Sequence, residues 1–199
     1  MNSVINTEYP LIGANDPAPV ITINEKGAAQ ILIVGDHAGR NIPEKMASLE
    51  LDPSALDKHI AYDIGTRDLI ERLSDLLDAP AVMSQYSRLL VDCNRHLHDL
   101  SAFPEFSDGV IIPANLNLSD EDKALRVQSF YQPYRVAIEA ALERFRKNQR
   151  VPAVISIHSF TPIMDGIHRP WHIGILWNTD ARIALPLLEQ LRTHSDQFC

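Results

Sequence analysis

The sequence contains little cysteine and no long apolar run. Its 199 residues include two cysteines, Cys93 and Cys199. Two cysteines cannot form a framework of several disulfides, so we expect a reducing, cytoplasmic environment. A membrane-spanning helix needs about 18 or more consecutive apolar residues, and none occurs. Residues 1–19 also lack the basic and apolar regions of a secretory signal peptide, so we expect neither secretion nor membrane contact.

Positive charge is scarce as well. The 18 lysines and arginines are outnumbered by 26 aspartates and glutamates, which leaves a net charge of -8. Because no basic block stands out, we expect no nucleic-acid partner. A small anionic substrate is still compatible with this composition, since a few local arginines can override the overall field. Hydrophobic residues make up 45% of the chain, enough for one domain with a sizeable core.

Apolar runs typical of strands alternate with stripes typical of helices. We expect strands at 20–23, 30–36, 81–84, 88–93, 153–158 and 172–177. We expect helices at 43–50, 55–78, 119–148 and 183–194. This alternation predicts an α/β fold of three layers, with helices on both faces of a mixed, mostly parallel sheet.

The domain organisation follows from the same pattern. Residues 1–28 are predicted to be an N-terminal arm, and residues 29–199 a single α/β domain. Residues 96–118 are rich in proline, aspartate and asparagine and show no clear period. A connection of this length inside a domain usually has a function, such as covering a site.

Two of the predicted strands lead directly into a histidine. His37 follows the apolar run 31–34, and His158 follows the run 153–157. Ligands of open α/β sheets bind at the carboxyl ends of strands, so both imidazoles are expected at one edge. A catalytic zinc needs three protein ligands and an open position for water, and imidazole binds zinc well. The alternative is that each histidine is a loop residue hydrogen-bonded to backbone.

A third ligand is therefore needed. Glutamate three residues after the first histidine is a common zinc spacing, but Arg40 occupies that position. Asp63, within the motif HIAYDIG at 59–65, is the better candidate because it lies near the start of a helix expected to pack on the sheet. A carboxylate there fits a metal ligand, and it equally fits a structural charge at a helix N-terminus.

Several arginines could bind an anionic substrate. Asn94 and Arg95 follow the apolar run 88–93, and a guanidinium beside an amide suits a carboxylate. Arg88 is a weaker second anchor, and Arg169 could also bind an anion. The alternative for Arg95 is an ion pair with a nearby acid of the protein.

Taken in order, these motifs resemble the N-formylglutamate amidohydrolase family. The matching segments are DHAG at 36–39, HIAYDIG at 59–65, YSRLLVDCNR at 86–95, SIHSFTP at 156–162 and RPWHIG at 169–174. The family is distantly similar to zinc carboxypeptidases and aspartoacylases. The resemblance implies a phosphorylase/hydrolase-like fold of the zinc carboxypeptidase kind. It further implies Zn²⁺, or another divalent metal, on His37 and His158 with Asp63 possible, and a substrate carboxylate on Asn94 and Arg95.

The resemblance also implies a reaction. The expected enzyme is a metal-dependent amidohydrolase that converts N-formyl-L-glutamate to L-glutamate and formate, as part of histidine degradation. The alternatives are a zinc carboxypeptidase or peptidoglycan amidase, and a catalytically impaired homologue that still binds metal. The oligomeric state is left open by the sequence.

Members of that family usually continue with a late strand that carries a glutamate, the expected general base. The present sequence stops at Cys199. The resemblance therefore predicts either a C-terminally truncated domain, with the base beyond Cys199, or a naturally short protein. Within the sequence, Glu105 in the long 96–118 connection is the acid we nominate as a substitute.

Overall fold

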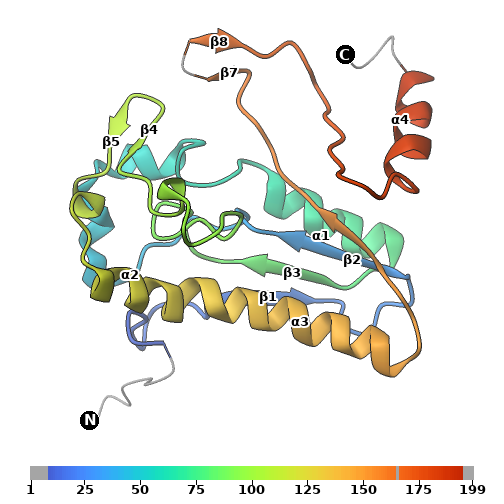
Figure 1. Ribbon diagram of the computed structural model, residues 1–199, viewed down its shortest axis with the longest axis horizontal. Coiled ribbons are helices and arrows are strands. Elements are labelled where there is room, and N and C mark those ends of the chain that lie inside the picture. The colour runs from blue at the N-terminus through green and yellow to red at the C-terminus, as the bar shows by residue number, and fades with distance from the viewer. Residues whose placement is uncertain (1–8, 165, 195–199) are drawn as a thin grey trace. The chain divides into compact units, whose positions relative to one another are not determined.

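A mixed four-stranded sheet is the centre of the computed structural model, which describes residues 9–164 and 166–194 (Figure 1). Its strands are β1 (Val20–Ile23), β2 (Ile31–Gly35), β3 (Ala81–Ser84) and β6 (Ala153–Ser156). They lie in the order β1-β3-β2-β6. Strand β2 pairs in parallel with β3 and β6, whereas β1 pairs antiparallel with β3. The predicted α/β class with a mixed sheet is thus confirmed.

Helices cover both faces of this sheet. The helical elements are α1 (Thr66–Leu77), α2 (Asp120–Arg126), a π-helical turn (Val127–Tyr131) and α3 (Gln132–Lys147). Leu32 of β2 packs with Tyr134 and Phe145 of α3. The next residue, Ile33, points to the other face and packs with Ile70 of α1. Alternate side chains of one strand thereby contact different helices, as a pleated strand requires.

The chain ahead of α1 was predicted to be helical from residue 55, and this prediction was wrong. A short 3-10 helix (Pro53–Asp57) is followed by turns, and α1 begins only at Thr66. Gly65 precedes α1 with φ of 79°, a left-handed conformation that glycine adopts readily. The turns direct the backbone N–H of Asp63 to the carbonyl of His37, at 3.0 Å, in place of a helical hydrogen bond.

The strand predicted at 88–93 is a buried loop instead. Leu89 and Leu90 are fully buried, which explains the apolar run. Their segment forms no ladder: the N–H of Leu90 bonds to Ser87 in a turn, and the N–H of Asp92 bonds to Ala102. An apolar run marks burial, but a strand also requires a neighbouring strand whose backbone groups are free to pair.

The segment between that loop and α2 contains short regular elements. A hairpin is formed by β4 (Phe106–Ser107) and β5 (Val110–Ile111). Short 3-10 helices occur at Leu100–Ala102 and Pro113–Asn115, and another earlier in the chain at Glu44–Glu50. Across the described residues, no helix has both the length and the apolar character needed to cross a bilayer.

Residues from Thr161 onward cluster as a second unit. Its described elements are β7 (Ile163–Met164), β8 (Ile167–His168) and α4 (Ala184–Arg192). Helix α4 agrees with the helix predicted at 183–194. The prediction of a strand at 172–177 was wrong, because these residues form no strand. The short β7–β8 hairpin was not predicted.

A buried arginine ties α2 to the 88–93 loop. The Arg126 guanidinium donates to the carbonyls of Leu90 and Ala114, at 3.1 and 3.0 Å, and to Oδ1 of Asn115 at 2.7 Å. Burial lowers the pKa of Arg126 to about 10, which leaves it charged at neutral pH. Asn115 in turn donates to the carbonyl of Leu89 at 2.8 Å. These side-chain hydrogen bonds satisfy backbone carbonyls of the loop that would otherwise pair with a neighbouring strand.

Replacing Arg126 with lysine should therefore destabilise the protein, because an ammonium cannot reach three acceptors that diverge around a planar guanidinium. We expect a loss of about 2 kcal/mol in the free energy of unfolding, roughly two buried hydrogen bonds. Chemical denaturation measures it. The matched control is Arg146→Lys, because Arg146 is 79% exposed and the change there should cost little. Equal stability of the two variants would contradict this stabilising role of the Arg126 hydrogen bonds.

Candidate metal centre

The two histidines from distant parts of the sequence lie side by side. His37 and His158 each lie two residues beyond a strand, β2 and β6 respectively. Because these strands are parallel and Val34 pairs with Ser156, both strands end at the same edge of the sheet. The ring centroids are 5.1 Å apart and the ring planes are inclined at 59°. The juxtaposition expected from the two apolar runs is present.

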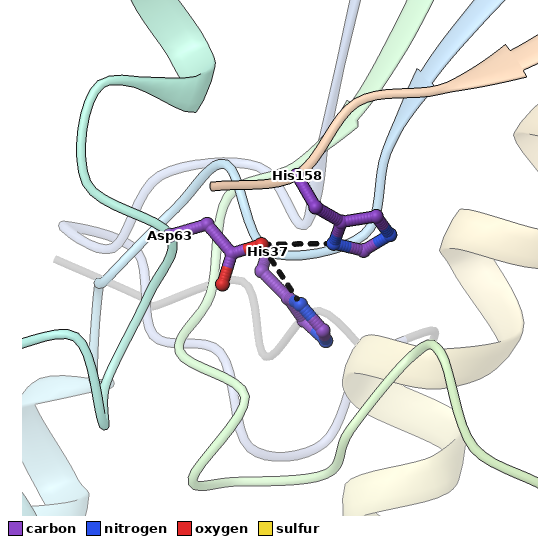
Figure 2. A group of neighbouring side chains, drawn as sticks. All are labelled: His37, Asp63 and His158. Carbon is purple, nitrogen blue, oxygen red and sulfur yellow. Dashed lines mark hydrogen bonds and ion pairs between the residues drawn. The ribbon is translucent and has the colours of Figure 1, made fainter. Parts of the chain in front are cut away.

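Asp63 completes the group. The hydrogen bond from its N–H to the carbonyl of His37 holds the Asp63 backbone beside that histidine. Figure 2 shows its carboxylate facing both rings: Oδ2 is 2.8 Å from Nδ1 of His158 and 3.4 Å from Nδ1 of His37. The same oxygen accepts a bond from the N–H of Ser159 at 3.3 Å. One carboxylate oxygen is therefore shared by both imidazoles.

The other ring nitrogens face two further carboxylates. Nε2 of His37 is 2.7 Å from Oδ1 of Asp92. Nε2 of His158 is 3.3 Å from Oδ2 of Asp36 and 3.1 Å from Oγ of Ser156. Both rings thus present Nδ1 to Asp63 and Nε2 to a different aspartate. Histidines that bind metals usually direct their second nitrogen to a carboxylate or a carbonyl in this way.

These residues fit a metal ion in their donor atoms and their spacing. Nδ1 of His37 is buried and has no hydrogen-bond partner within residues 9–164 and 166–194, an uncommon state for a polar atom. Ligand atoms of His37, Asp63 and His158 all lie within 4.8 Å of one another. Around a tetrahedral zinc with bonds of about 2.0–2.1 Å, neighbouring ligand atoms are about 3.4 Å apart. Two imidazoles and a carboxylate are also a common donor set for catalytic zinc.

The charges around the site fit a divalent cation as well. Asp36, Asp63 and Asp92 are all buried, and among the described residues their ion pairs are with the two histidines and Arg88. Three carboxylates and one guanidinium leave two negative charges when both imidazoles are neutral. A buried charge is costly unless it is compensated. One divalent cation, or two protons on the histidines, restores the balance.

The pKa values agree with that count. Hydrogen bonds to Asp36 and Asp63 raise the pKa of His158 to about 9, although burial opposes them. Burial lowers the pKa of His37, but the nearby carboxylates of Asp63 and Asp92 outweigh it and the net shift is upward. Burial raises the pKa of Asp63, but the two histidines and Arg88 bring it well below its usual range. Without a metal, the cluster therefore favours ionised carboxylates beside protonated imidazoles.

The arginines and the acid predicted to contact substrate lie in different places. Arg88 bridges two carboxylates of the site, with Nη2 2.7 Å from Asp92 and Nη1 3.4 Å from Asp63. Asn94 and Arg95 follow Asp92 on the same loop, and both side chains are exposed. Arg169 belongs to the second unit, and Glu105 is an exposed residue just before β4. Their roles toward a substrate stay predictions.

Two carboxylates of the site were not assigned there from the sequence. In the sequence, Asp92 and Asp36 occur only as members of the motifs YSRLLVDCNR and DHAG. Both adjoin motif residues, so proximity in the sequence was the available signal. Their partners could not be read from it, since Asp92 contacts His37 across 55 positions and Asp36 contacts His158 across 122.

Comparison with known protein families assigns this chain to one of them. A family model for N-formylglutamate amidohydrolase matches residues 29–199. The crystal structure of a gene product from Agrobacterium tumefaciens is similar, with 31% identity and a TM-score of 0.89 over 92% of this chain and 72% of that chain. An N-formylglutamate amidohydrolase from Ralstonia eutropha shows 18% identity and a TM-score of 0.49, over 72% of this chain and 58% of that chain. No curated protein matches significantly.

Removing either imidazole should abolish stoichiometric metal binding, because two remaining ligands hold zinc poorly. We expect His37→Ala and His158→Ala to retain far less than one equivalent of zinc by elemental analysis, and Asp63→Asn to bind more weakly than the parent. His96→Ala is the matched control, since His96 is an exposed histidine outside the cluster. Full zinc occupancy in both histidine variants would show that these histidines do not form the zinc site.

Proposed function

The chain belongs to the N-formylglutamate amidohydrolase family, and we propose that it hydrolyses N-formyl-L-glutamate to L-glutamate and formate at a metal centre formed by His37, Asp63 and His158. The family consists of hydrolases that act on this amide. The observation that carries the proposal is that the three ligand atoms lie within 4.8 Å of one another, with a buried nitrogen among them that has no hydrogen-bond partner in the described part of the chain. We further propose a zinc carboxypeptidase-like fold, a cytoplasmic location and a part in histidine degradation.

The side chains of the site would divide the work between them. His37, Asp63 and His158 would hold Zn²⁺ or another divalent ion and leave a further coordination position open. When bound, zinc supplies Lewis acidity that polarises the formyl carbonyl and brings the pKa of a coordinated water to about 7. Asp92 would keep the proton of His37 on Nε2, which leaves Nδ1 free as a ligand.

The loop that supports His37 also carries the proposed substrate anchors. Oδ1 of Asp92 accepts a hydrogen bond from the backbone N–H of Asn94 at 2.8 Å. The backbone carbonyl of Asp92 accepts another from the N–H of Arg95 at 3.1 Å. The Tyr131 hydroxyl donates to the carbonyl of Arg95 at 3.2 Å. This support leaves the Arg95 guanidinium and the Asn94 amide available to a carboxylate. Arg88 and Arg169 are proposed as further contacts to the anionic substrate.

Hydrolysis also requires a group that takes a proton from water and passes it to the leaving amine. Glu105 is the acid that we propose for this role on the present chain. Its carbonyl accepts a hydrogen bond from the N–H of Ile112 at 2.9 Å, which holds the backbone of Glu105 at the base of the β4–β5 hairpin. Glu105 is exposed to solvent, and we propose that its carboxylate transfers the proton.

Arg95→Lys should weaken the binding of N-formyl-L-glutamate, because lysine cannot form the paired bonds of a guanidinium with a carboxylate. We expect a cost on the order of 2 kcal/mol, about a thirty-fold rise in KM, with a smaller change in kcat. Formate release in the presence of zinc is the assay. The matched control is Arg146→Lys, an exposed position on α3. Unchanged kinetics in Arg95→Lys would show that Arg95 does not touch the substrate.

Glu105→Gln tests the proposed base. If Glu105 transfers the proton, kcat should fall about 10²-fold or more, while zinc content stays at the parent level. Glu121→Gln is suitable for comparison, as Glu121 is an exposed glutamate in the first turn of α2. Full turnover in Glu105→Gln would exclude this residue. A zinc-loaded parent that releases no formate would count against the proposed reaction, independently of the metal centre.

A further inference from the structure

We infer that Asp36 is a positioning residue that orients His158, and that it does for the second histidine what Asp92 does for the first. The inference rests on the metal centre proposed above. It concerns how the chain holds one imidazole in place, and it assigns a function to a buried carboxylate that the proposed reaction does not otherwise use.

Asp36 lies where two neighbouring strands end. It directly follows the last residue of β2, Gly35, and its carboxylate is buried. From there its Oδ2 reaches across to the parallel strand β6, where Ser156 Oγ donates at 3.0 Å. The backbone N–H of Ile157 bonds to the carbonyl of Val34 at 3.0 Å, so the pairing of β2 with β6 continues just beyond the end of β6. Asp36 therefore reaches His158 from a fixed backbone.

The carboxylate contacts the far side of the His158 ring. Asp36 Oδ2 lies 3.3 Å from Nε2, while Nδ1 of the same ring points at Asp63. An acceptor at Nε2 keeps the proton there and leaves the Nδ1 lone pair free for a metal. Because the ring separates Asp36 from Asp63, Asp36 is not placed as a ligand. It acts on the metal position only through His158.

His158 depends on this contact more than His37 depends on its own partner. The His37 side chain is 2% exposed and is held by packing, whereas the His158 side chain is 33% exposed. A ring that is open to solvent on one side can rotate unless hydrogen bonds hold it. Among the described residues, Nε2 of His158 contacts Asp36 and Ser156.

A purely structural role for Asp36 makes a different prediction. If Asp36 only links β2 to Ser156, its removal should destabilise the metal-free and metal-loaded protein equally and leave zinc affinity unchanged. If it orients His158, zinc affinity should fall by roughly 10- to 100-fold, the usual effect of losing the carboxylate behind a metal-binding histidine. Metal affinity therefore distinguishes the two roles.

The experiment compares the full chain with Asp36→Asn, which keeps the shape of the side chain and removes its charge, and with Asp36→Ala. Zinc affinity is measured by competition with a chromophoric chelator, and the ligand field by the visible spectrum of the Co²⁺-loaded protein. We expect at least about tenfold weaker zinc binding in both variants and an altered Co²⁺ spectrum. Ser74→Ala is the matched control: Ser74 is fully buried and donates to the carbonyl of Ala79 at 2.7 Å, away from the sheet edge that carries the histidines. It should lower the Tm without changing zinc affinity.

The outcomes separate this inference from the proposal on which it rests. If the parent binds zinc and both Asp36 variants bind it within twofold of the parent, the positioning role is overturned and the metal centre stands. If the parent binds no zinc, the metal centre and the positioning role fall together. If Ser74→Ala loses zinc affinity as strongly as Asp36→Asn, general destabilisation explains the effect and the positioning role is again overturned.

Discussion

Three carboxylates are buried around two imidazoles at one edge of the sheet, and much of the chain is arranged to make this possible. Asp36, Asp63 and Asp92 each arrive from a different segment, and each contacts a histidine. Buried carboxylates without compensation would oppose folding by several kcal/mol. Arg88 supplies one compensating positive charge, so two negative charges remain when both imidazoles are neutral. The remaining demand for two positive charges is the physical reason why this edge of the sheet suits a divalent ion.

The backbone around the site follows from that constraint. The turns at 58–65 were predicted to be part of a helix, and the loop at 88–93 was predicted to be a strand. These are the segments that carry Asp63 and Asp92. In both, backbone groups bond to other segments instead of to a regular neighbour: Asp63 to His37, and Asp92 to Ala102. Local pattern and tertiary structure tend to disagree where a chain must place functional side chains. Two of the three wrong element predictions therefore fall on the candidate site.

The position of the carboxylate ligand shows how the chain uses long-range contacts. Three residues after the first histidine, where a ligand glutamate would fit a common zinc spacing, this chain has Arg40. Its guanidinium pairs with Asp57 and lies 5.4 Å from the centre of the Tyr62 ring. In the proposed metal centre the carboxylate comes instead from Asp63, next to Tyr62. Arg40 therefore packs against the segment that carries Asp63.

The sequence by itself determined the fold class, the strands that carry the two histidines, the family, and Asp63 as the candidate third ligand. These features depend on local signals: apolar runs, periodicity and short motifs. Only the tertiary structure decided that Nδ1 of each histidine faces Asp63, and that Asp92, Asp36 and Arg88 surround the pair. These contacts join residues that are mostly far apart along the chain, through the parallel pairing of β2 with β6 and the turns before α1. A hydrogen bond between distant segments leaves no periodic trace in a sequence, because its geometry is set by how the backbone packs.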